Sequence, residues 1–306
     1  MNEEAKPKIS IIVPAYNEGD VIFPFLQKLQ QVVQENNINA EILVINDGSS
    51  DNTANEVLST GALLIEHPYN IGYGAAIKTG YRQAQGTVFI TIDADGQHNP
   101  TDIPRLLELI DRYDMVVGNR TQDSETDLHR NIANAIYNRL ATYVAGQKIL
   151  DLTSGFRAIR ANIARQFLYL LPNTFSSSAT ITLSMIRAGH SLTYIPIRVT
   201  RRANKSKSKI RLLEDGTRFL MIILRIAIFF APLKIFVPLS LITFLLGLGY
   251  GLFRIFVLRA NYGSTSALLL STSVLVFLVG LVSEQIAQLR LDRSESFSSI
   301  RNDPDP

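Results

Sequence analysis

Thr91-Ile92-Asp93-Ala94-Asp95-Gly96-Gln97-His98 is the stretch that decides the fold, because it places two carboxylates at the end of an apolar run. The preceding residues 87–90 have the β-branched and aromatic character of a buried strand. Since side chains alternate along a strand, Asp93 and Asp95 should point to the same side, with Ala94 facing away. Two such carboxylates suit Mg²⁺ or Mn²⁺ held partly by the phosphates of a substrate. The competing interpretation is a surface turn with solvated acids.

Apolar segments alternate with amphipathic segments on both sides of this run. Strands are predicted at residues 9–13, 41–45, 62–65, 87–92 and 114–118, and helices at 20–36, at 74–84 and from about 101. This alternation predicts an α/β fold, with a parallel sheet covered by helices on both faces. Ligands of such sheets bind at the carboxyl ends of the strands. Glu18 and Asp47 follow the first two strands as the acidic pair follows the fourth, so these acids should converge on one edge.

The composition excludes several classes of site. The chain of 306 residues has no cysteine, which rules out disulfides, thiolate metal sites and thiol catalysis. Its formal net charge of +3 is too small for bulk binding of nucleic acid, so we expect no nucleic-acid partner. Gly72-Tyr73-Gly74 resembles part of a dinucleotide fingerprint, but Ile77 stands where that fingerprint needs its third glycine. The sequence therefore argues against an NAD site.

The C-terminal third is far more apolar than the rest. Residues 235–253 and 260–283 contain no charged residue, and a membrane core of about 30 Å needs roughly 20 helical residues. Both runs are predicted to be transmembrane helices joined as a hairpin; buried helices of a soluble domain are the alternative. Basic residues without an acid fill 198–211, which places both long ends in the cytoplasm, although Arg254 and Arg259 in the connection weaken the bias. We thus expect a multi-pass protein of the inner or plasma membrane with a cytoplasmic N-terminal domain.

Residues 211–230 carry arginines on one predicted helical face. Arg211, Arg218 and Arg225 follow one another at intervals of two helical turns. This pattern is typical of an interfacial helix whose arginines reach past apolar neighbours to the headgroups, and a soluble core helix is the alternative. The residues from 291 to 306 are largely polar and end in an Asp-Pro-Asp-Pro run, which predicts a disordered tail.

Four short segments carry the most specific pattern in the chain. They are Pro14-Ala15-Tyr16-Asn17-Glu18, Asn46-Asp47-Gly48-Ser49-Ser50-Asp51, Asn70-Ile71-Gly72-Tyr73-Gly74-Ala75 and Asp93-Ala94-Asp95-Gly96-Gln97. In this order they resemble glycosyltransferase family 2. Within it, the chain looks like the polyprenyl-phosphate glycosyltransferases, such as dolichol-phosphate mannose synthases and bacterial undecaprenyl-phosphate glucosyltransferases. With the apolar pattern, this predicts a GT-A catalytic domain at 1–210, an interfacial region at 211–230, two transmembrane helices at 231–290 and a cytoplasmic tail at 291–306.

The resemblance, which covers about residues 8–230, implies roles for the residues at the predicted edge. Those expected to hold the base and ribose are Pro14, Tyr16, Glu18 and Asp47, and those expected to hold the metal and the diphosphate are Asp93, Asp95 and Gln97. The cofactor implied is Mg²⁺ or Mn²⁺. Without the family, Pro14 and Tyr16 are also explained as loop residues, and Asp47 as an Asx-type turn.

Two further segments resemble the family's acceptor site. Val117-Gly118-Asn119-Arg120 and Leu128-His129-Arg130 are similar to segments whose arginines bind the lipid phosphate, which a planar guanidinium suits. Asn134 stands where relatives can carry a serine, and its amide could still donate a hydrogen bond. Asp151, which opens Asp151-Leu152-Thr153-Ser154-Gly155-Phe156, is a candidate catalytic or acceptor-site acid, or a helix-capping residue.

The basic segment 201–209 resembles the family's Arg-x-x-Gly-x-Ser-Lys loop. Arg201, Ser206 and Lys207 would then bind the nucleotide sugar. An asparagine replaces the glycine, and Ser208-Lys209 repeats the Ser-Lys pair, so either pair fits the role. A polybasic patch on anionic lipid, worth ~1 kcal/mol per charge, is an alternative that can hold at the same time.

The resemblance implies inverting, metal-dependent transfer of a sugar from a nucleotide sugar to a polyprenyl phosphate. UDP-glucose is the favoured donor by analogy with the two-span bacterial enzymes, and GDP-mannose is the alternative. A processive polysaccharide synthase is disfavoured, because its Gln-x-x-Arg-Trp motif needs a tryptophan and this chain has none. A non-catalytic membrane scaffold or flippase partner would not need these acids on one edge. The expected partners are donor, acceptor and membrane lipid, and assembly into a homo-oligomer stays open.

Overall fold

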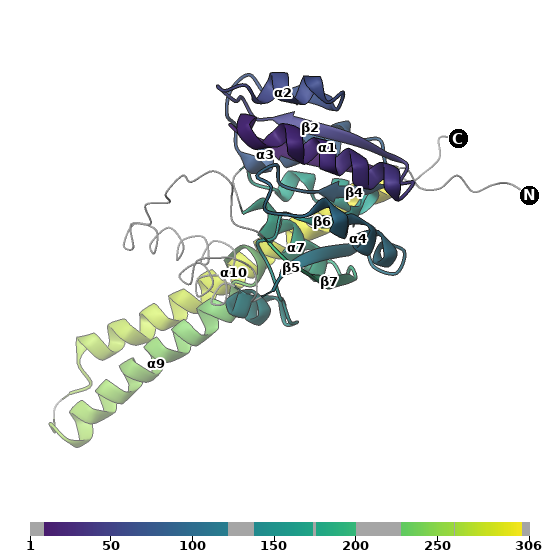
Figure 1. Cartoon of the computed structure of the whole chain (residues 1–306). Helices are drawn as coiled ribbons and strands as arrows, with labels where there is room; N and C mark the ends of the chain where they lie inside the picture. The colour runs from purple at the N-terminus through teal and green to yellow at the C-terminus, as the bar shows by residue number, and fades with distance from the viewer. Residues whose placement is uncertain (1–8, 122–137, 174–175, 200–227, 260, 302–306) are drawn as a thin grey trace, which may run out of the picture. The chain divides into compact units, whose positions relative to one another are not determined.

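The sheet is built around β1 (Ile9–Ala15), in which every residue is buried. Such a strand is covered on both faces and needs a nearly continuous apolar run. The computed structural model describes residues 9–121, 138–173, 176–199, 228–259 and 261–301 (Figure 1). These residues form two compact units, one containing the sheet and the other containing the two long C-terminal helices.

Seven strands form one mixed sheet in the order β3-β2-β1-β4-β6-β5-β7. Besides β1 they are β2 (Ala40–Asn46), β3 (Leu63–Glu66), β4 (Val88–Thr91), β5 (Met115–Arg120), β6 (Arg157–Arg160) and β7 (Leu192–Ile197). The chain adds β2 and β3 on one side of β1 and then β4 on the other side, with all four strands parallel. The carboxyl ends of β1 and β4 therefore form a topological switch point, which is where open α/β sheets bind ligands.

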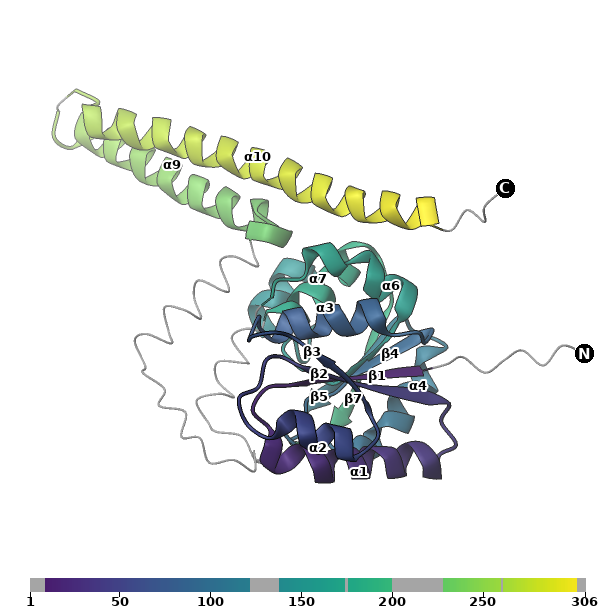
Figure 2. The same ribbon diagram turned by 90° about the horizontal axis from the view of Figure 1, so that it is seen from above.

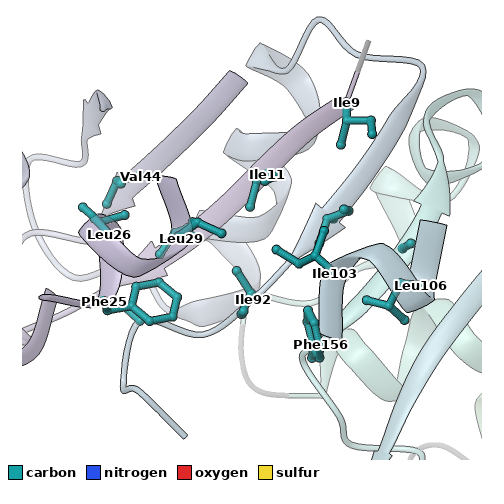
Figure 3. Close-up of a cluster of buried hydrophobic side chains, with 14 of the residues drawn as sticks. Ile9, Ile11, Phe25, Leu26, Leu29, Val44, Ile92, Ile103, Leu106 and Phe156 are labelled. Atoms are coloured by element: carbon teal, nitrogen blue, oxygen red, sulfur yellow. The ribbon is translucent and has the colours of Figure 1, made fainter. Parts of the chain in front are cut away.

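Helices cover both faces of this sheet, as Figure 2 shows. They are α1 (Gly19–Glu35), α2 (Thr53–Ser59), α3 (Tyr73–Gln83), α4 (Ile103–Ile110), α6 (Ala161–Gln166) and α7 (Ser177–Arg187), with short 3-10 turns η1 (Pro100–Asp102) and η2 (Leu168–Leu170). Alternate residues of β1 enter two separate cores: Ile11 packs in the core under α1 and α4 (Figure 3), and Ile12 packs in the core under α3, α6 and α7. The period of two along the strand thus produces the three-layer arrangement.

Helix α3 approaches the sheet closely because it carries a glycine where the two meet. A Cβ atom added to Gly80 would lie 2.4 Å from Cγ2 of Ile12, which is fully buried in β1. No larger residue fits without moving the helix or the strand. This contact sets the distance between α3 and the sheet. Helix α3 begins with Tyr73, whose hydroxyl contacts Asp93 of the acidic turn.

The expectation of a wholly parallel sheet is wrong at one strand. β6 lies between β4 and β5 and is antiparallel to both. The reason is that the chain before β6 is held at the carboxyl edge: Asp151 binds Arg120 at the end of β5, and Thr91 Oγ1 at the end of β4 donates to the carbonyl of Gly155 (2.6 Å). A strand that starts at that edge must run back across the sheet.

The second unit contains α9 (Leu233–Phe256) and α10 (Ser264–Arg301), which lie side by side (Figure 1). Small residues allow the close approach: a Cβ on Gly247 would lie 2.8 Å from Leu269 Cβ, and one on Gly280 would lie 2.6 Å from Phe236 Cβ. Two segments of these helices, Leu233–Phe256 and Ser264–Leu289, are long and apolar enough to cross a membrane. Only 17% of each apolar window is buried, whereas the core helix of a soluble protein would be mostly buried.

Helix α10 also extends further than the sequence predicted. It continues to Arg301, into the segment that we expected to be disordered from residue 291. Helix propagation is cooperative, so a long apolar helix extends readily into a neighbouring polar stretch that lacks proline. The first proline after Ser264 is Pro304, which lies outside the described residues.

Candidate active site

The loops after β1 and β2 are joined by hydrogen bonds into one surface at the carboxyl edge. The backbone N–H of Asn17 donates to Ser49 Oγ (2.9 Å), and that of Ser50 donates to Asn17 Oδ1 (2.8 Å). Asn17 adopts a positive φ of 55°, which asparagine tolerates better than most residues. Asp51 Oδ2 accepts a hydrogen bond from the N–H of Gly19 at the start of α1 (2.9 Å). The two family-like loops therefore behave as one rigid platform.

Three predicted donor-site residues lie on or under this platform. Pro14 is buried within β1, and Glu18 is 6% exposed with its N–H donating to Thr53 Oγ1 (3.0 Å). Tyr16 is 46% exposed, so its ring is accessible, and its role in base binding stays a prediction. Pro14 and Glu18 are buried and support the loop that follows β1.

Asp47 is buried at the end of β2 and has three hydrogen-bond partners. Its carboxylate binds His67 Nδ1 (2.7 Å) and accepts from the N–H groups of Ile71 (3.1 Å) and Gly72 (2.8 Å). The other ring nitrogen of the histidine, Nε2, lies 2.9 Å from Thr79 Oγ1. The carboxylate therefore anchors the β3–α3 loop, and any contact with the donor is made in addition to these bonds.

The acidic turn after β4 carries the two aspartates predicted to bind the metal. Ala94 is buried, whereas Asp93 and Asp95 are both partly exposed, as the alternating pattern predicts. Asp93 Oδ1 accepts from the Tyr73 hydroxyl (3.0 Å), and Asp93 Oδ2 lies 3.7 Å from His98 Nε2. Asp95 Oδ1 accepts from the N–H of Gln97 (3.1 Å), which closes the turn. The turn is thus held by contacts on both of its aspartates.

This pair fits a divalent cation that a substrate helps to bind. Within the described part of the chain, no group of three or more His, Cys, Asp or Glu residues could hold a metal alone. Two carboxylates leave the remaining positions for water and phosphate oxygens, as Mg²⁺ prefers. Burial alone would raise the pKa of Asp93, but His98, Tyr73 and Arg157 outweigh burial and lower it. Burial and the neighbouring Asp93 raise the pKa of Tyr73 well above its usual value, so its hydroxyl keeps its proton.

Arg120 and Asp151, predicted from separate segments, form a bidentate ion pair. Arg120 Nε lies 2.7 Å from Asp151 Oδ2, and Arg120 Nη2 lies 2.8 Å from Oδ1. The N–H groups of Thr153 and Ser154 also donate to Oδ1 (3.1 Å each). Burial opposes ionisation of Asp151, but Arg120 and the N–H of Thr153 lower its pKa overall. Asp151 is therefore an occupied carboxylate that holds Arg120.

Arg157 is a buried cation that the sequence analysis missed. It is 2% exposed, and Nη1 donates to the carbonyl of Ser178 and to Thr182 Oγ1 (3.1 Å each). Nη2 donates to the carbonyl of Ser154, and no carboxylate forms a salt bridge with Arg157 among the described residues. A charged residue inside the apolar run 156–159 was the available signal. Tyr73 was also missed: the segment around it was recognised as family-like, but no role was predicted for the tyrosine itself.

The remaining predicted site residues lie outside the described residues. They are Arg130 and Asn134 of the acceptor prediction and Arg201, Ser206 and Lys207 of the basic loop. The interfacial helix predicted at 211–230 falls almost entirely in the same category. Their roles stay predictions.

Comparison with known protein families shows to which family the chain belongs. Residues 10–168, more than half of the chain, match the profile of Glycosyl transferase family 2. The chain belongs to glycosyltransferase family 2. Residues 231–289 match a second profile, the GtrB C-terminal hairpin, which confirms the predicted resemblance to the membrane-anchored branch. The prediction of a glycosyltransferase is thereby confirmed.

Similar proteins support the same family assignment. An uncharacterised protein of Methanocaldococcus jannaschii is 30% identical over 65% of this chain and 84% of its own length. An undecaprenyl-phosphate 4-deoxy-4-formamido-L-arabinose transferase of Klebsiella pneumoniae is 32% identical over 56% of this chain and 57% of its own length, and one of Photorhabdus laumondii is 29% identical over 61% and 62%. The chain thus spans only about three fifths of these named transferases.

Solved structures confirm the GT-A-like fold. A glucosyl-3-phosphoglycerate synthase of Mycobacterium tuberculosis, in complex with phosphoglyceric acid, has a TM-score of 0.57 and 16% identity, covering 73% of this chain and 81% of its own. The same enzyme in complex with Mn²⁺, UDP and phosphoglyceric acid gives a TM-score of 0.57 at 17% identity, covering 73% and 79%. At this identity, the similarity establishes the fold alone.

Proposed function

We propose that this glycosyltransferase moves a sugar from a nucleoside-diphosphate sugar to a polyprenyl phosphate, with inversion and with a divalent cation, at the cytoplasmic face of a membrane. The observation that carries the proposal is the joining of a family 2 domain to an apolar hairpin in one chain. A polyprenyl phosphate keeps its tail in the bilayer and its charged head at the interface. A catalytic domain tethered by a hairpin works where that head is located.

Several observations support the donor side of this proposal. Asp93 and Asp95 follow β4, and the joined loops that carry Tyr16 and Asp47 follow β1 and β2, so all lie at one edge of the sheet. The Mycobacterium tuberculosis neighbour was solved with Mn²⁺ and UDP-glucose, which favours UDP-glucose as the first donor to test. When bound, the cation neutralises the negative charge that develops on the departing diphosphate. The carboxylates of Asp93 and Asp95 would hold it, with Gln97 as the third predicted ligand.

Binding of the acceptor phosphate gives the Arg120–Asp151 ion pair a role. A phosphate monoester is already anionic near pH 7, since its second pKa is about 6, so the acceptor needs positioning more than deprotonation. Asp151 binds Nε and Nη2 of Arg120, whose side chain is 14% exposed, and we propose that Nη1 meets a phosphate oxygen of the acceptor. We therefore assign Asp151 the task of fixing Arg120, not that of a general base. One direct displacement then inverts the sugar carbon.

The test is transfer of radiolabelled sugar to undecaprenyl phosphate by purified, detergent-solubilised protein. UDP-glucose is tried first, GDP-mannose second and a nucleotide-linked 4-amino-arabinose derivative third, because the named relatives transfer such a sugar. Asp95→Asn should reduce transfer at least ~100-fold, since removing a group that stabilises transition-state charge costs that much. Asp111→Asn, which alters an exposed acid at the end of α4, is the matched control and should behave like the wild type. A product of retained configuration would refute the single displacement, and no product with any donor would refute the function.

A further inference from the structure

The first residue of α3 reaches into the acidic turn. The Tyr73 hydroxyl donates to Asp93 Oδ1 (3.0 Å). The preceding residue, Gly72, is held through its N–H by Asp47 (2.8 Å), and the N–H of Gly74 donates to the carbonyl of Asn173 (2.9 Å). The phenol is therefore attached to a backbone fixed on both sides. A rigid donor on one carboxylate oxygen restricts rotation of the carboxylate, whose terminal torsion is otherwise broad.

A buried positive charge lies behind this contact. Arg157 lines a small cavity together with Tyr73, Tyr81 and Thr91, and it attracts Asp93 electrostatically. Burying a guanidinium among neutral acceptors is costly unless a negative charge is near. Tyr73 thus shares a cavity with this buried guanidinium and carries the Asp93 carboxylate at its hydroxyl.

Position 155 makes room for the contact. A Cβ atom on Gly155 would lie 2.7 Å from the Tyr73 hydroxyl oxygen and 2.7 and 2.8 Å from the two carboxylate oxygens of Asp93. Gly155 has no positive φ, so its backbone does not itself require glycine. A Cβ at this position would instead push the phenol and the carboxylate out of their present places. The absence of a side chain at Gly155 therefore leaves space for the hydrogen bond between Tyr73 and Asp93.

We propose that Tyr73 is a positioning residue that holds the Asp93 carboxylate in the orientation that binds the divalent cation. The proposal rests on the proposed function, because it assumes that Asp93 is a cation ligand. With Oδ1 held by the phenol, Oδ2, which lies 3.7 Å from His98 Nε2, is the oxygen that the proposal assigns to the cation. Groups that orient metal ligands in this way change metal affinity by 10- to 100-fold when removed.

The test measures Mn²⁺ binding to the full-length, detergent-solubilised protein in the presence of UDP, by the loss of the free Mn²⁺ signal in electron paramagnetic resonance. Tyr73→Phe removes only the hydroxyl and should raise the Kd for Mn²⁺ about 10- to 100-fold. Tyr81→Phe is the matched control: Tyr81 is on the same helix and lines the same cavity, but no hydrogen bond joins it to Asp93. Its Kd should stay within about twofold of the wild type. The transfer activity of Tyr73→Phe, relative to that of the wild type, should be higher at saturating Mn²⁺ than at low Mn²⁺.

A second variant tests whether weaker Mn²⁺ binding comes from loss of the Tyr73–Asp93 contact and not from a folding defect. Gly155→Ala places a methyl group against the two flexible side-chain ends and should also weaken Mn²⁺ binding. The double variant should bind no more weakly than the poorer single variant, because both changes remove one contact. Unchanged Mn²⁺ affinity in Tyr73→Phe, or additive losses in the double variant, would overturn the positioning role while the proposed function stands. Absence of Mn²⁺ binding in the wild type would instead overturn the proposed function, and this inference with it.

Discussion

At the scale of single residues, the Arg120–Asp151 pair links stability to pH. The Asp151 side chain is 5% exposed and its pKa is lowered, largely by Arg120 acting against burial. A carboxyl with a lowered folded pKa stabilises the protein above its unfolded pKa of about 3.9, and this contribution is lost as the pH falls through the folded pKa. Asp151→Asn should therefore destabilise the protein by about 3 kcal/mol at pH 7, because it leaves a buried guanidinium without its partner.

The measurement is the apparent Tm of the detergent-solubilised protein at pH 7 and at about pH 3.5. The variant should melt roughly 6–12 °C below the wild type at pH 7, at ~2–4 °C per kcal/mol, and the gap should narrow at low pH. Asp102→Asn is the control, since Asp102 pairs with Arg105 at a surface where ion pairs are worth little. A gap of equal size at both pH values would contradict the electrostatic explanation.

Sequence reasoning found the residues whose chemistry is visible in a local pattern. Asp93 and Asp95 were recognisable because one buried residue separates two acids after a strand. Tyr73 and Arg157 were not, because their importance depends on contacts with residues far away in sequence. Asp47 is an intermediate case: its position was predicted correctly, but its bonds to His67 and the β3–α3 loop depend on the fold.

At the scale of elements, the α3–β1 contact tightly constrains the packing of the sheet domain. Gly80→Ala should destabilise the protein by about 1–3 kcal/mol, because the new Cβ would lie 2.4 Å from Ile12 Cγ2 in a filled core. Gly249→Ala is the control, since a Cβ at this helical glycine meets nothing within 4 Å. The free energy of unfolding of each variant, measured by chemical denaturation, is compared with that of the wild type.

The same contact predicts non-additivity. Ile12→Ala alone should cost about 2–5 kcal/mol, but it should cost less in the Gly80→Ala background, where it removes the clash. Equal costs in both backgrounds would show that α3 does not rest on Ile12.

The elements that were predicted share a physical feature, which is a periodic apolar pattern within one segment. β1, β2 and β4 were recognisable because buried parallel strands are almost continuously apolar. β6 was not predicted as a strand, and its direction is decided by bonds that hold residues 151–155 at the carboxyl edge. No pattern inside β6 itself reports those bonds.

At the scale of the whole molecule, the hairpin should behave as a membrane anchor. Leu245 is 56% exposed in α9, so an arginine there would face lipid, at a cost of about 2.5–3.5 kcal/mol for insertion at the helix centre. Leu245→Arg should reduce the fraction of chain that resists carbonate extraction from membranes. Leu58→Arg, on the 61% exposed Leu58 of α2, should leave that fraction unchanged. Equal extraction of both variants would favour a soluble role for the hairpin.

The central claim is that the phosphate of a polyprenyl lipid accepts the sugar, and matched acceptors test it most directly. Purified wild-type protein is given Mn²⁺, radiolabelled UDP-glucose and either undecaprenyl phosphate or undecaprenol, and the label in the organic phase is counted. We predict metal-dependent labelling of undecaprenyl phosphate and none of undecaprenol. Equal labelling of both lipids, or release of UDP without any labelled lipid, would contradict the account.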